Sequence, residues 1–378
     1  MKVIIVGSGL AGPVAALALQ RLNIASKIFE LRSGTAFEGG NIALAPNALR
    51  VLDQLGVQKR YGYKALRISR GIVRQTLLEA VHERGIELRY NSRLVDVRET
   101  AQSTVIATFA DGHIEEADFL IGADGIHSRV RTYLDPTSIP RFSGQMGVGG
   151  TLPLSKLPES YRDMYMPCLI LGKLNSLLLM PCTNSGDRVG VAATVEAQDR
   201  TREGWAQLQN DKEGIYTELQ SHHENDSWPE VVHVACRDIE PSSLSIWPFF
   251  QLPELDSWTS HSNKVIVIGD AAHAMPPTGG QGAAMAFEDA ITLADTLALI
   301  DGKDEDPAES VKQWQTDRRE RTKKILQFTS TGGNMRKSSV STYKQIIKEW
   351  VMWAYFLWVG KEARTSWIYE YETKRAVP

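Results

Sequence analysis

Two glycine-rich stretches could bind a phosphate-containing cofactor. The first, VIIVGSGLAG, carries Gly7, Gly9 and Gly12 in the spacing GxGxxG between an apolar strand and a helix, with Leu10 and Ala11 in the same turn. In that setting the first glycine permits a tight turn, the second lets the backbone approach a pyrophosphate, and the third allows close helix–strand packing. The free N–H groups and positive dipole end of the helix then favour phosphate.

An acidic residue follows at the spacing expected for a ribose partner. Glu30 ends the apolar run that begins at Lys27, and a carboxylate at this place accepts hydrogen bonds from ribose hydroxyls. Arg32 lies just beyond it, where its side chain can contact the ribose or a phosphate, or lie in solvent. This order favours dinucleotide binding over a purely structural turn, but it does not distinguish NAD from FAD.

The second stretch, GDAAHAMPPTGGQGAAMAFEDA, runs from Gly269 to Ala290 after another apolar strand. Asp270 could accept hydrogen bonds from ribitol hydroxyls, and the glycine loop could line a flavin edge with N–H groups. A helix that begins near Gly282 would direct its N-terminus at the ring atoms that gain negative charge on flavin reduction. The stretch therefore indicates FAD, and the alternative is a structural turn that is rich in glycine.

A third stretch, DFLIGADGIHSRVR, places Asp124 and Gly125 between a buried strand and a basic helix start. By itself this is an ordinary turn, since Asp and Gly are common turn residues. Taken with the other two stretches, it is interpreted as a third loop that faces the cofactor.

The hydrophobic pattern predicts the elements that position these loops. Residues 2–30 are typical of a βαβ unit, and residues 46–56 and 69–85 of helices. In the second helix we expect the core positions Ile72, Leu77, Leu78 and Val81. A short strand follows at 86–90, and residues 103–125 indicate a strand, a hairpin turn at Asp111-Gly112 and a second strand.

The pattern changes beyond residue 141. Short apolar runs alternate with polar turns from about 142 to 236, which predicts a mainly antiparallel sheet; residues 264–270 again resemble a buried parallel strand, and the last hundred residues are mostly helical. We expect an α/β fold with a Rossmann-like FAD-binding lobe (1–69, 70–140 and 246–300), an inserted β-sheet substrate lobe (141–245) and a C-terminal helical segment (301–378).

Length and composition limit the functional classes. A chain of 378 residues exceeds the usual size of one hydrophobic core, which predicts two lobes. The net charge of -3 gives no indication of nucleic acid or of an anionic membrane. The three cysteines, Cys168, Cys182 and Cys236, have no metal-binding spacing and suit a reducing, cytoplasmic compartment. No signal peptide is expected, and the apolar run from Trp350 to Gly360 is too short to span a bilayer.

Together the three stretches resemble the single-component, FAD-dependent aromatic hydroxylases (group A flavoprotein monooxygenases) of the salicylate and 6-hydroxynicotinate hydroxylase type. GGNIALAPNALRVLDQLG resembles the family pattern GxGIxLxPNAxxxLxxLG, and ISRGIVRQTLL resembles its RxxLxxxL helix. The tail WIYEYE is similar to the end of fungal and bacterial members. The resemblance covers most of the chain.

The resemblance implies roles for individual residues. Glu30 would hold the adenosine ribose, and Arg70 would reach the FAD phosphates or the ribityl chain. Asp124 would lie beside the pyrophosphate and the path of the nicotinamide cofactor, while Asp270 would bind ribitol. His273 is expected to be structural rather than catalytic. Further contacts with FAD are implied for Gly40, Pro277, Gly280, Gly282 and Ala283.

The resemblance also implies the reaction. NADH or NADPH would reduce the flavin, and the reduced flavin would react with O2 to give a C4a-hydroperoxide that hydroxylates or epoxidises a small aromatic or enol-type substrate. No catalytic base is identified, because Tyr165, His222, His223 and His233 are each more readily explained as structural or exposed residues.

One departure leaves an alternative open. Between Gly56 and Ser69 this chain is shorter than its relatives, which predicts a smaller substrate sheet or a more open site. The alternative is therefore an FAD-binding protein with an altered oxidoreductase reaction or a non-catalytic scaffold role. The aromatic segment from Trp350 to Trp367 could cover what the missing strands expose.

Overall fold

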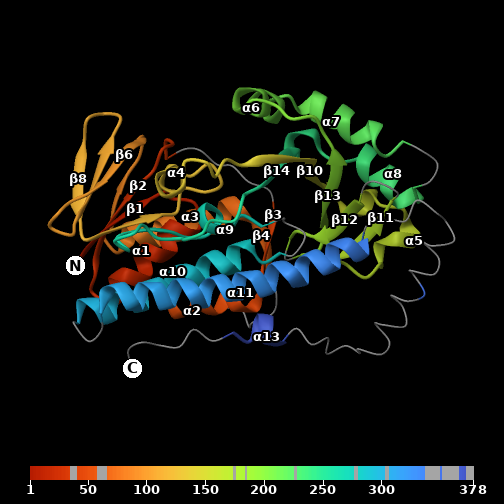
Figure 1. The fold of residues 1–378 in the computed structure, drawn as a ribbon. Helices are drawn as coiled ribbons and strands as arrows, with labels where there is room; N and C mark the ends of the chain where they lie inside the picture. The colour runs from red at the N-terminus through yellow and green to blue at the C-terminus, as the bar shows by residue number, and fades with distance from the viewer. Residues whose placement is uncertain are drawn as a thin grey trace.

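The computed structural model describes residues 1–34, 41–57, 66–172, 176–183, 185–224, 228–275, 280–302, 306–336, 350 and 366–371. It contains two large sheets, one parallel and one antiparallel, which lie at opposite ends of the molecule (Figure 1). Two long helices, α10 (Gly282–Asp301) and α11 (Pro307–Arg336), run beneath the parallel sheet. The expected α/β fold with an antiparallel second sheet is confirmed.

The parallel sheet has the order β15-β9-β1-β2-β5. Its strands are β1 (Lys2–Val6), β2 (Ala25–Phe29), β5 (Glu87–Arg89), β9 (Phe119–Gly122) and β15 (Val265–Val267). The central strand is apolar and buried on both faces, which is typical of parallel strands covered on each side. Because neighbouring parallel strands end at the same edge, the loops after β1, β2, β9 and β15 converge there.

Small side chains allow helices to approach one face of this sheet closely. Helix α1 (Ala11–Arg21) is buried from Ala11 to Leu19, and it packs against α10. The opposite face is covered by a three-stranded antiparallel sheet of β6 (Leu94–Glu99), β7 (Val105–Phe109) and β8 (Ile114–Ala117). Phe29 of β2 stacks on Phe109 of β7 with ring centroids 4.3 Å apart. The expected hairpin at Asp111-Gly112 joins β7 to β8, but β9 is a separate strand of the parallel sheet.

A second pair of predicted helices is confirmed, with one correction. Helices α2 (Pro46–Gln54) and α3 (Arg70–Glu83) follow strands β3 (Asn41–Leu44) and β4 (Leu66–Ser69), which pair antiparallel. Val73, Leu77 and Val81 form the buried stripe of α3, whereas Ile72 is 53% exposed. The prediction of Ile72 as a core residue was wrong because the helical spacing of four selects Val73. Leu78, also expected in the core, is only half-buried.

The second sheet has the order β11-β12-β13-β10-β14 and is antiparallel throughout. Its strands are β10 (Arg141–Pro153), β11 (Cys168–Leu171), β12 (Ser176–Pro181), β13 (Arg188–Glu196) and β14 (Ser245–Gln251). Short helices lie beside it: α4 (Arg129–Leu134) precedes it, and α5 (Glu159–Arg162) interrupts it. Strand β14 begins at the expected limit of this lobe, residue 245, and continues to Gln251.

Three helices lie between residues 202 and 237, which corrects the expectation of a sheet up to residue 236. They are α6 (Arg202–Asn210), α7 (Lys212–Ser221) and α8 (Glu230–Arg237), and these cover one face of the second sheet (Figure 1). The side chains of Thr201 and Asp211 cap α6 and α7 by accepting backbone N–H bonds. The pairs Ile215–Leu219 and Val231–Ala235 give the helical spacing that a search for short strands passed over.

The end of the chain contributes helix α13 (Ser366–Tyr369), which contacts α2. Ile368 is 1% exposed, and Trp367 packs edge-on against Phe328 of α11. Trp350 is exposed, and the rest of the aromatic segment that we expected to cover the substrate sheet lies outside the described residues up to 365. The shortened stretch after Gly56 also lies largely outside them.

Candidate functional site: the edge where four strand ends meet

The turn after β1 is a close-packed glycine turn with one open position. Gly7 has φ +104°, and a β-carbon there would lie 2.5 Å from the carbonyl oxygen of Ala123. A β-carbon on Gly12 would overlap the carbonyl oxygen of Gly7. At Gly9, in contrast, no atom lies within 4 Å of the β-carbon position. The fold therefore requires Gly7 and Gly12, while Gly9 leaves free space at the N-terminus of α1.

Glu30 closes this turn from the end of β2. Its carboxylate accepts hydrogen bonds from the N–H groups of Ser8 (2.6 Å) and Arg32 (2.9 Å). The residue is 9% exposed. Since an ionised carboxylate has about four acceptor positions, two of them are available to hydroxyl groups of a ligand. The side chain of Arg32 is exposed.

Arg74, which the sequence analysis did not select, holds the glycine turn from α3. Its Nε donates to the carbonyl oxygen of Ser8 (2.8 Å), and Nη2 contacts the Ser8 hydroxyl (2.9 Å). Arg70, the residue implied by the resemblance, is exposed at the first position of α3. The two arginines are four residues apart and share a helix face, and this spacing was the signal that could have identified Arg74.

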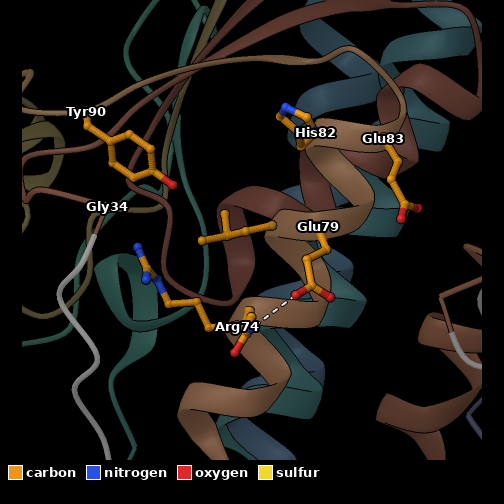
Figure 2. A pocket seen from close by; sticks show the side chains of 8 residues that line it. Gly34, Arg74, Glu79, His82, Glu83 and Tyr90 are labelled. Atoms are coloured by element: carbon orange, nitrogen blue, oxygen red, sulfur yellow. Dashed lines mark hydrogen bonds between the residues drawn. The ribbon is translucent and has the colours of Figure 1, made fainter.

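A cavity of about 340 Å³ opens beside this turn (Figure 2). Arg74, Leu78 and His82 of α3 form one wall, and Gly34 and Tyr90 lie across from them. Because Arg74 lines it and also binds Ser8, the cavity lies next to the turn that Glu30 closes.

Asp124 follows β9 and stabilises the start of α4. Its carboxylate accepts from the Ser128 hydroxyl (2.5 Å) and from the Arg129 N–H (2.7 Å). Burial raises the pKa of Asp124, and the hydrogen bonds from Ser128 and Arg129 oppose that effect without cancelling it. The side chain is thus partly committed to its own loop.

Arg131, a second residue that the sequence analysis missed, ties this loop to the one after β15. It is 1% exposed, and Nη1 donates to the carbonyl oxygens of Ala271 and Ala272, each at 3.0 Å. The same guanidinium binds the Ser138 hydroxyl and the carbonyl oxygen of Pro253. The loops after β9 and β15 are therefore fixed relative to each other by protein contacts.

The loop after β15 presents a carboxylate and an open helix end. Gly269 has φ +59°, and Asp270 begins the short helix α9 (Asp270–His273) with an exposed side chain. Within the described residues the Asp270 carboxylate has no hydrogen-bond or ion-pair partner.

Gly282 starts α10, and nothing lies within 4 Å of its β-carbon position. Ala283 follows in the first turn of α10, and Gly280 lies against Ala43 of β3. Gly40 and Pro277 lie outside the described residues.

His273 belongs to a buried ionic network. Its Nε2 lies 2.5 Å from the Asp289 carboxylate, which also accepts from the Gly269 N–H (3.0 Å) and from Nε of Arg318 (2.8 Å). Burial alone would raise the pKa of Asp289, but the charges of His273 and Arg318 outweigh it and lower that pKa to about 2. Asp289 thus connects the loop after β15 to α11.

A neighbouring carboxylate extends the network to the end of the chain. Glu288, 1% exposed, binds Nη1 of Arg318 (2.8 Å) and Nε of Arg321 (2.9 Å), and it accepts from Asn47 of α2 (2.8 Å). Arg321 also donates to the carbonyl oxygens of Trp367 and Ile368. The final segment 366–371 is therefore tied to α10 and α11 through Arg321.

The remaining candidate bases lie elsewhere. Tyr165 is 90% exposed, and His223 is buried with Nδ1 2.8 Å from the carbonyl oxygen of Leu219. His233 contacts the carbonyl oxygen of Trp228, and His222 pairs with Glu218 on α7. None of these residues lies at the edge where the four strand ends meet. Among the described residues there is no metal-binding group of His, Cys, Asp or Glu, and none of the described helices is long and apolar enough to cross a bilayer.

A family model and several known proteins are similar to this chain over most of its length. The sequence model described as "FAD binding domain" matches residues 1–72 and 69–329. The chain is 28% identical to 3-hydroxybenzoate 6-hydroxylase of Klebsiella oxytoca over 373 residues, covering 89% of this chain and 88% of that protein. It is 26% identical to salicylate hydroxylase of Pseudomonas putida over 398 residues, covering 92% and 90%.

The fold is likewise similar to a solved structure. A substrate complex of salicylate hydroxylase superimposes with a TM-score of 0.78 at 21% identity, covering 100% of this chain and 98% of that one. The likeness extends over both sheets and is not limited to the cofactor-binding strands. The resemblance inferred from the three glycine-rich and acidic stretches is confirmed.

Proposed function

The chain belongs to the FAD binding domain family and is an FAD-dependent aromatic monooxygenase, and we propose which of its residues hold the flavin and what it oxidises. The observation that carries the proposal is the convergence of four strand ends on one edge of the parallel sheet. In such sheets, ligands bind in the crevice outside the carboxyl ends of the strands.

The described residues fit an extended FAD. Gly9 and Gly282 each open into free space beside a helix N-terminus, where backbone N–H groups favour a phosphate or a negatively charged ring edge. We assign Gly7, Gly9, Leu10, Ala11 and Gly12 to the pyrophosphate. Glu30 and Arg32 are assigned to the adenosine ribose. Arg70 and Asp124 are assigned to the phosphates, Asp270 to the ribitol, and Gly280, Gly282 and Ala283 to the flavin ring. Gly40 and Pro277 stay predictions from the resemblance.

The bound flavin supplies the chemistry, by taking a hydride from NADH or NADPH and then activating O2. The protein contributes position and charge. The N-terminus of α10 would stabilise negative charge that gathers on the reduced ring. Arg131 and Asp289 keep the loops that carry Asp124 and Asp270 at a fixed separation. The parts of the site assigned to the pyrophosphate and to the ribitol would therefore keep a constant distance from each other.

The substrate would be a small aromatic or enol-type compound that lies between the flavin and the second sheet. Two relatives are named for 3-hydroxybenzoate and salicylate, which are hydroxylated benzoic acids. Substrate-stimulated oxidation of NADH or NADPH, with one atom of 18O from O2 found in the product, would support the proposal. An FAD-loaded protein that never consumes NAD(P)H with any phenol, pyridine or enol would favour the alternative of an altered reaction or a scaffold.

We further propose that the enzyme works in the cytoplasm. All three cysteines are free thiols in the structure, as is usual where the surroundings are reducing. Burial raises the pKa of the Cys236 thiol to about 12, so this residue is inert.

A further inference from the structure

We propose that the substrate of this monooxygenase is a neutral, largely apolar ring compound that lies flat against Trp247, and that an aromatic carboxylate is a poor substrate. The inference rests on the proposed function and deepens it, since it names the substrate class of the same site. It follows from the side chains that the second sheet presents on the face opposite α6, α7 and α8.

The strand register divides the side chains of this sheet between two faces. Directly paired residues of antiparallel strands lie on the same face, and successive residues alternate. Val148, Ala193 and Leu177 share one register line and are buried in the core with α6–α8. The neighbouring line of Gly149, Ala192 and Leu178 therefore lies on the opposite face.

That opposite face is turned toward the cofactor-binding side of the molecule. In Figure 1, α6, α7 and α8 lie on the outer side of the sheet, while β3, β4 and the start of α10 lie on its inner side. The contact of Gly280 with Ala43 places the start of α10 beside β3. A compound that touches both the flavin ring and this sheet must use the inner face.

Trp247 of β14 lies flat on the inner face because its neighbour strand has no side chains there. A β-carbon at Gly147 would overlap the indole ring, and one at Gly149 would lie 2.9 Å from its far edge. Trp247 pairs directly with Gly147. The half-buried indole thus rests on the backbone of β10 and offers a rigid aromatic surface at little entropic cost.

The strands beyond Trp247 carry mainly hydrocarbon groups, with hydroxyls at Thr194 and Ser176 on the register line of Gly147. Ala192 and Thr194 of β13 pair with Gly149 and Gly147, and Leu178 of β12 pairs with Ala192. Neighbouring strands lie about 4.8 Å apart, so the backbones of β10, under the Trp247 ring, and of β12, which carries Leu178, are roughly 10 Å apart. A planar ring that rests on the indole can therefore extend over Ala192 toward Leu178. The half-buried Thr194 hydroxyl can hydrogen-bond to a phenol or a carbonyl group without a formal charge.

The charged residues of this face lie at its ends and do not favour an anion in the middle. Arg188 is on the inner line of β13, but it is bound to Glu240 and to the Thr151 hydroxyl at one end of the sheet. Glu196 stands at the other end, with an exposed side chain. A substrate carboxylate placed against Ala192 would lose water without gaining a cation from the sheet, which is costly. A neutral ring has no such penalty.

Pairs of compounds that differ only in charge test this proposal on the FAD-loaded enzyme. Salicylate is compared with methyl salicylate, and 4-hydroxybenzoate with its methyl ester. The dissociation constant is read from the change in flavin absorbance, and turnover from NAD(P)H oxidation. We expect the ester to bind at least tenfold more tightly in each pair. Tighter binding of the acids, or no spectral change with any neutral ring, would overturn the proposal.

Binding and turnover separate this proposal from the proposed function. A neutral ring that binds next to the flavin and leaves NAD(P)H oxidation unchanged would count against the monooxygenase reaction while keeping the substrate class. If only the acids stimulate NAD(P)H oxidation, the monooxygenase reaction is supported and the neutral substrate class is rejected.

Two variants test the named residues. Leu178→Arg adds a cation to the middle of the inner face and should shift the acid-to-ester preference about tenfold toward the acid, because a charge-assisted hydrogen bond then becomes available. Ile114→Arg, which adds the same charge at a 61% exposed position of β8, should leave the preference unchanged. Trp247→Leu should weaken binding of every neutral ring about tenfold, and Trp247→Phe should weaken it less. An unchanged preference in Leu178→Arg, or unchanged binding in Trp247→Leu, would reject the assignment.

Discussion

Asp289 and Arg318 form an ion pair that is closed to solvent: Oδ1 and Nε lie 2.8 Å apart, and the side chains are 0% and 1% exposed. Asp289 also binds the N–H of Gly269 and the ring of His273. The Asp289 carboxylate of α10 therefore holds the turn that presents Asp270, and Arg318 of α11 neutralises its charge. Removal of one partner of a buried pair typically costs about 3–5 kcal/mol.

The Asp289 carboxylate should make stability depend on pH in the acid range. Its pKa is lowered to about 2 in the folded protein, against an ordinary value of 3.8. The carboxylate therefore stabilises the fold fully above its unfolded pKa of about 4, and this contribution is lost as the pH falls toward 2. The loss should be roughly 2 kcal/mol in the free energy of unfolding.

Urea unfolding between pH 5 and pH 2 measures this contribution. Asp289→Asn should be about 3 kcal/mol less stable at pH 7 and should show a smaller decline with acid than the wild type. Asp163→Asn removes an exposed carboxylate at the end of α5 and serves as the control. Equal acid profiles for wild type and Asp289→Asn would show that another group causes the decline.

Gly9 and Gly12 should respond differently to the same substitution. Gly9→Ala enters free space and should leave the stability of the apoprotein within about 0.5 kcal/mol, while FAD affinity falls because the methyl group occupies the pyrophosphate path. Gly12→Ala collides with the carbonyl of Gly7 and should lower the stability itself. Thermal unfolding of both apoproteins, with FAD titration by fluorescence, distinguishes the two effects. Unchanged FAD affinity in a folded Gly9→Ala protein would contradict the assignment.

Asp270 should matter for the cofactor and not for the fold. Its side chain is exposed and has no partner among the described residues, so Asp270→Ala should keep its melting temperature as apoprotein. FAD affinity should fall by about tenfold to a hundredfold through loss of hydrogen bonds from ribitol hydroxyls to a charged group. Asp96→Ala on β6, 56% exposed, is the matched control. A yellow Asp270→Ala protein with wild-type affinity would show the ribitol assignment to be wrong.

Substitutions of Arg74 and Arg70 should also have different effects on stability and on FAD affinity. Arg74→Met removes two contacts with Ser8 and should destabilise the apoprotein by about 1–3 kcal/mol, with weaker FAD binding as a consequence. Arg70→Met should reduce FAD affinity at unchanged apoprotein stability, since the side chain is exposed. Chemical unfolding with and without FAD measures both. A stability loss in Arg70→Met that equals that of Arg74→Met would contradict this division of roles.

Arg131 should couple two loops that lie 140 residues apart in the chain. Arg131→Met keeps the length of the side chain but leaves the carbonyl groups of Ala271 and Ala272 without their donor. We expect a loss of about 2–4 kcal/mol and faster hydrogen exchange at both loops. Arg129→Met, at an exposed neighbouring position, should change neither. Protection that is lost at the loop of Asp124 alone would argue against the coupling.

The sequence by itself determined the cofactor, the reaction class and the local elements that carry them. Gly7, Gly12 and Glu30 occupy positions where turn geometry and strand endings allow few residue types, and such local requirements are visible in spacing. The parallel strands were equally visible, because strands buried on both faces are continuous apolar runs. The apolar spacing of residues 202–237 was also present, but short amphipathic helices and short strands are easily confused.

Only the tertiary structure decided which distant groups meet. Arg74 rather than Arg70 holds Ser8, Arg131 joins two loops, and Asp289 pairs with Arg318, since each contact depends on how the elements pack around the sheet. The same holds for Trp247, whose place on Gly147 and Gly149 follows from strand register and not from any local pattern. A sequence encodes periodicity and turn chemistry within a few residues. A buried charged group, or an aromatic ring such as that of Trp247, contacts its partner only after the sheets and helices have packed together.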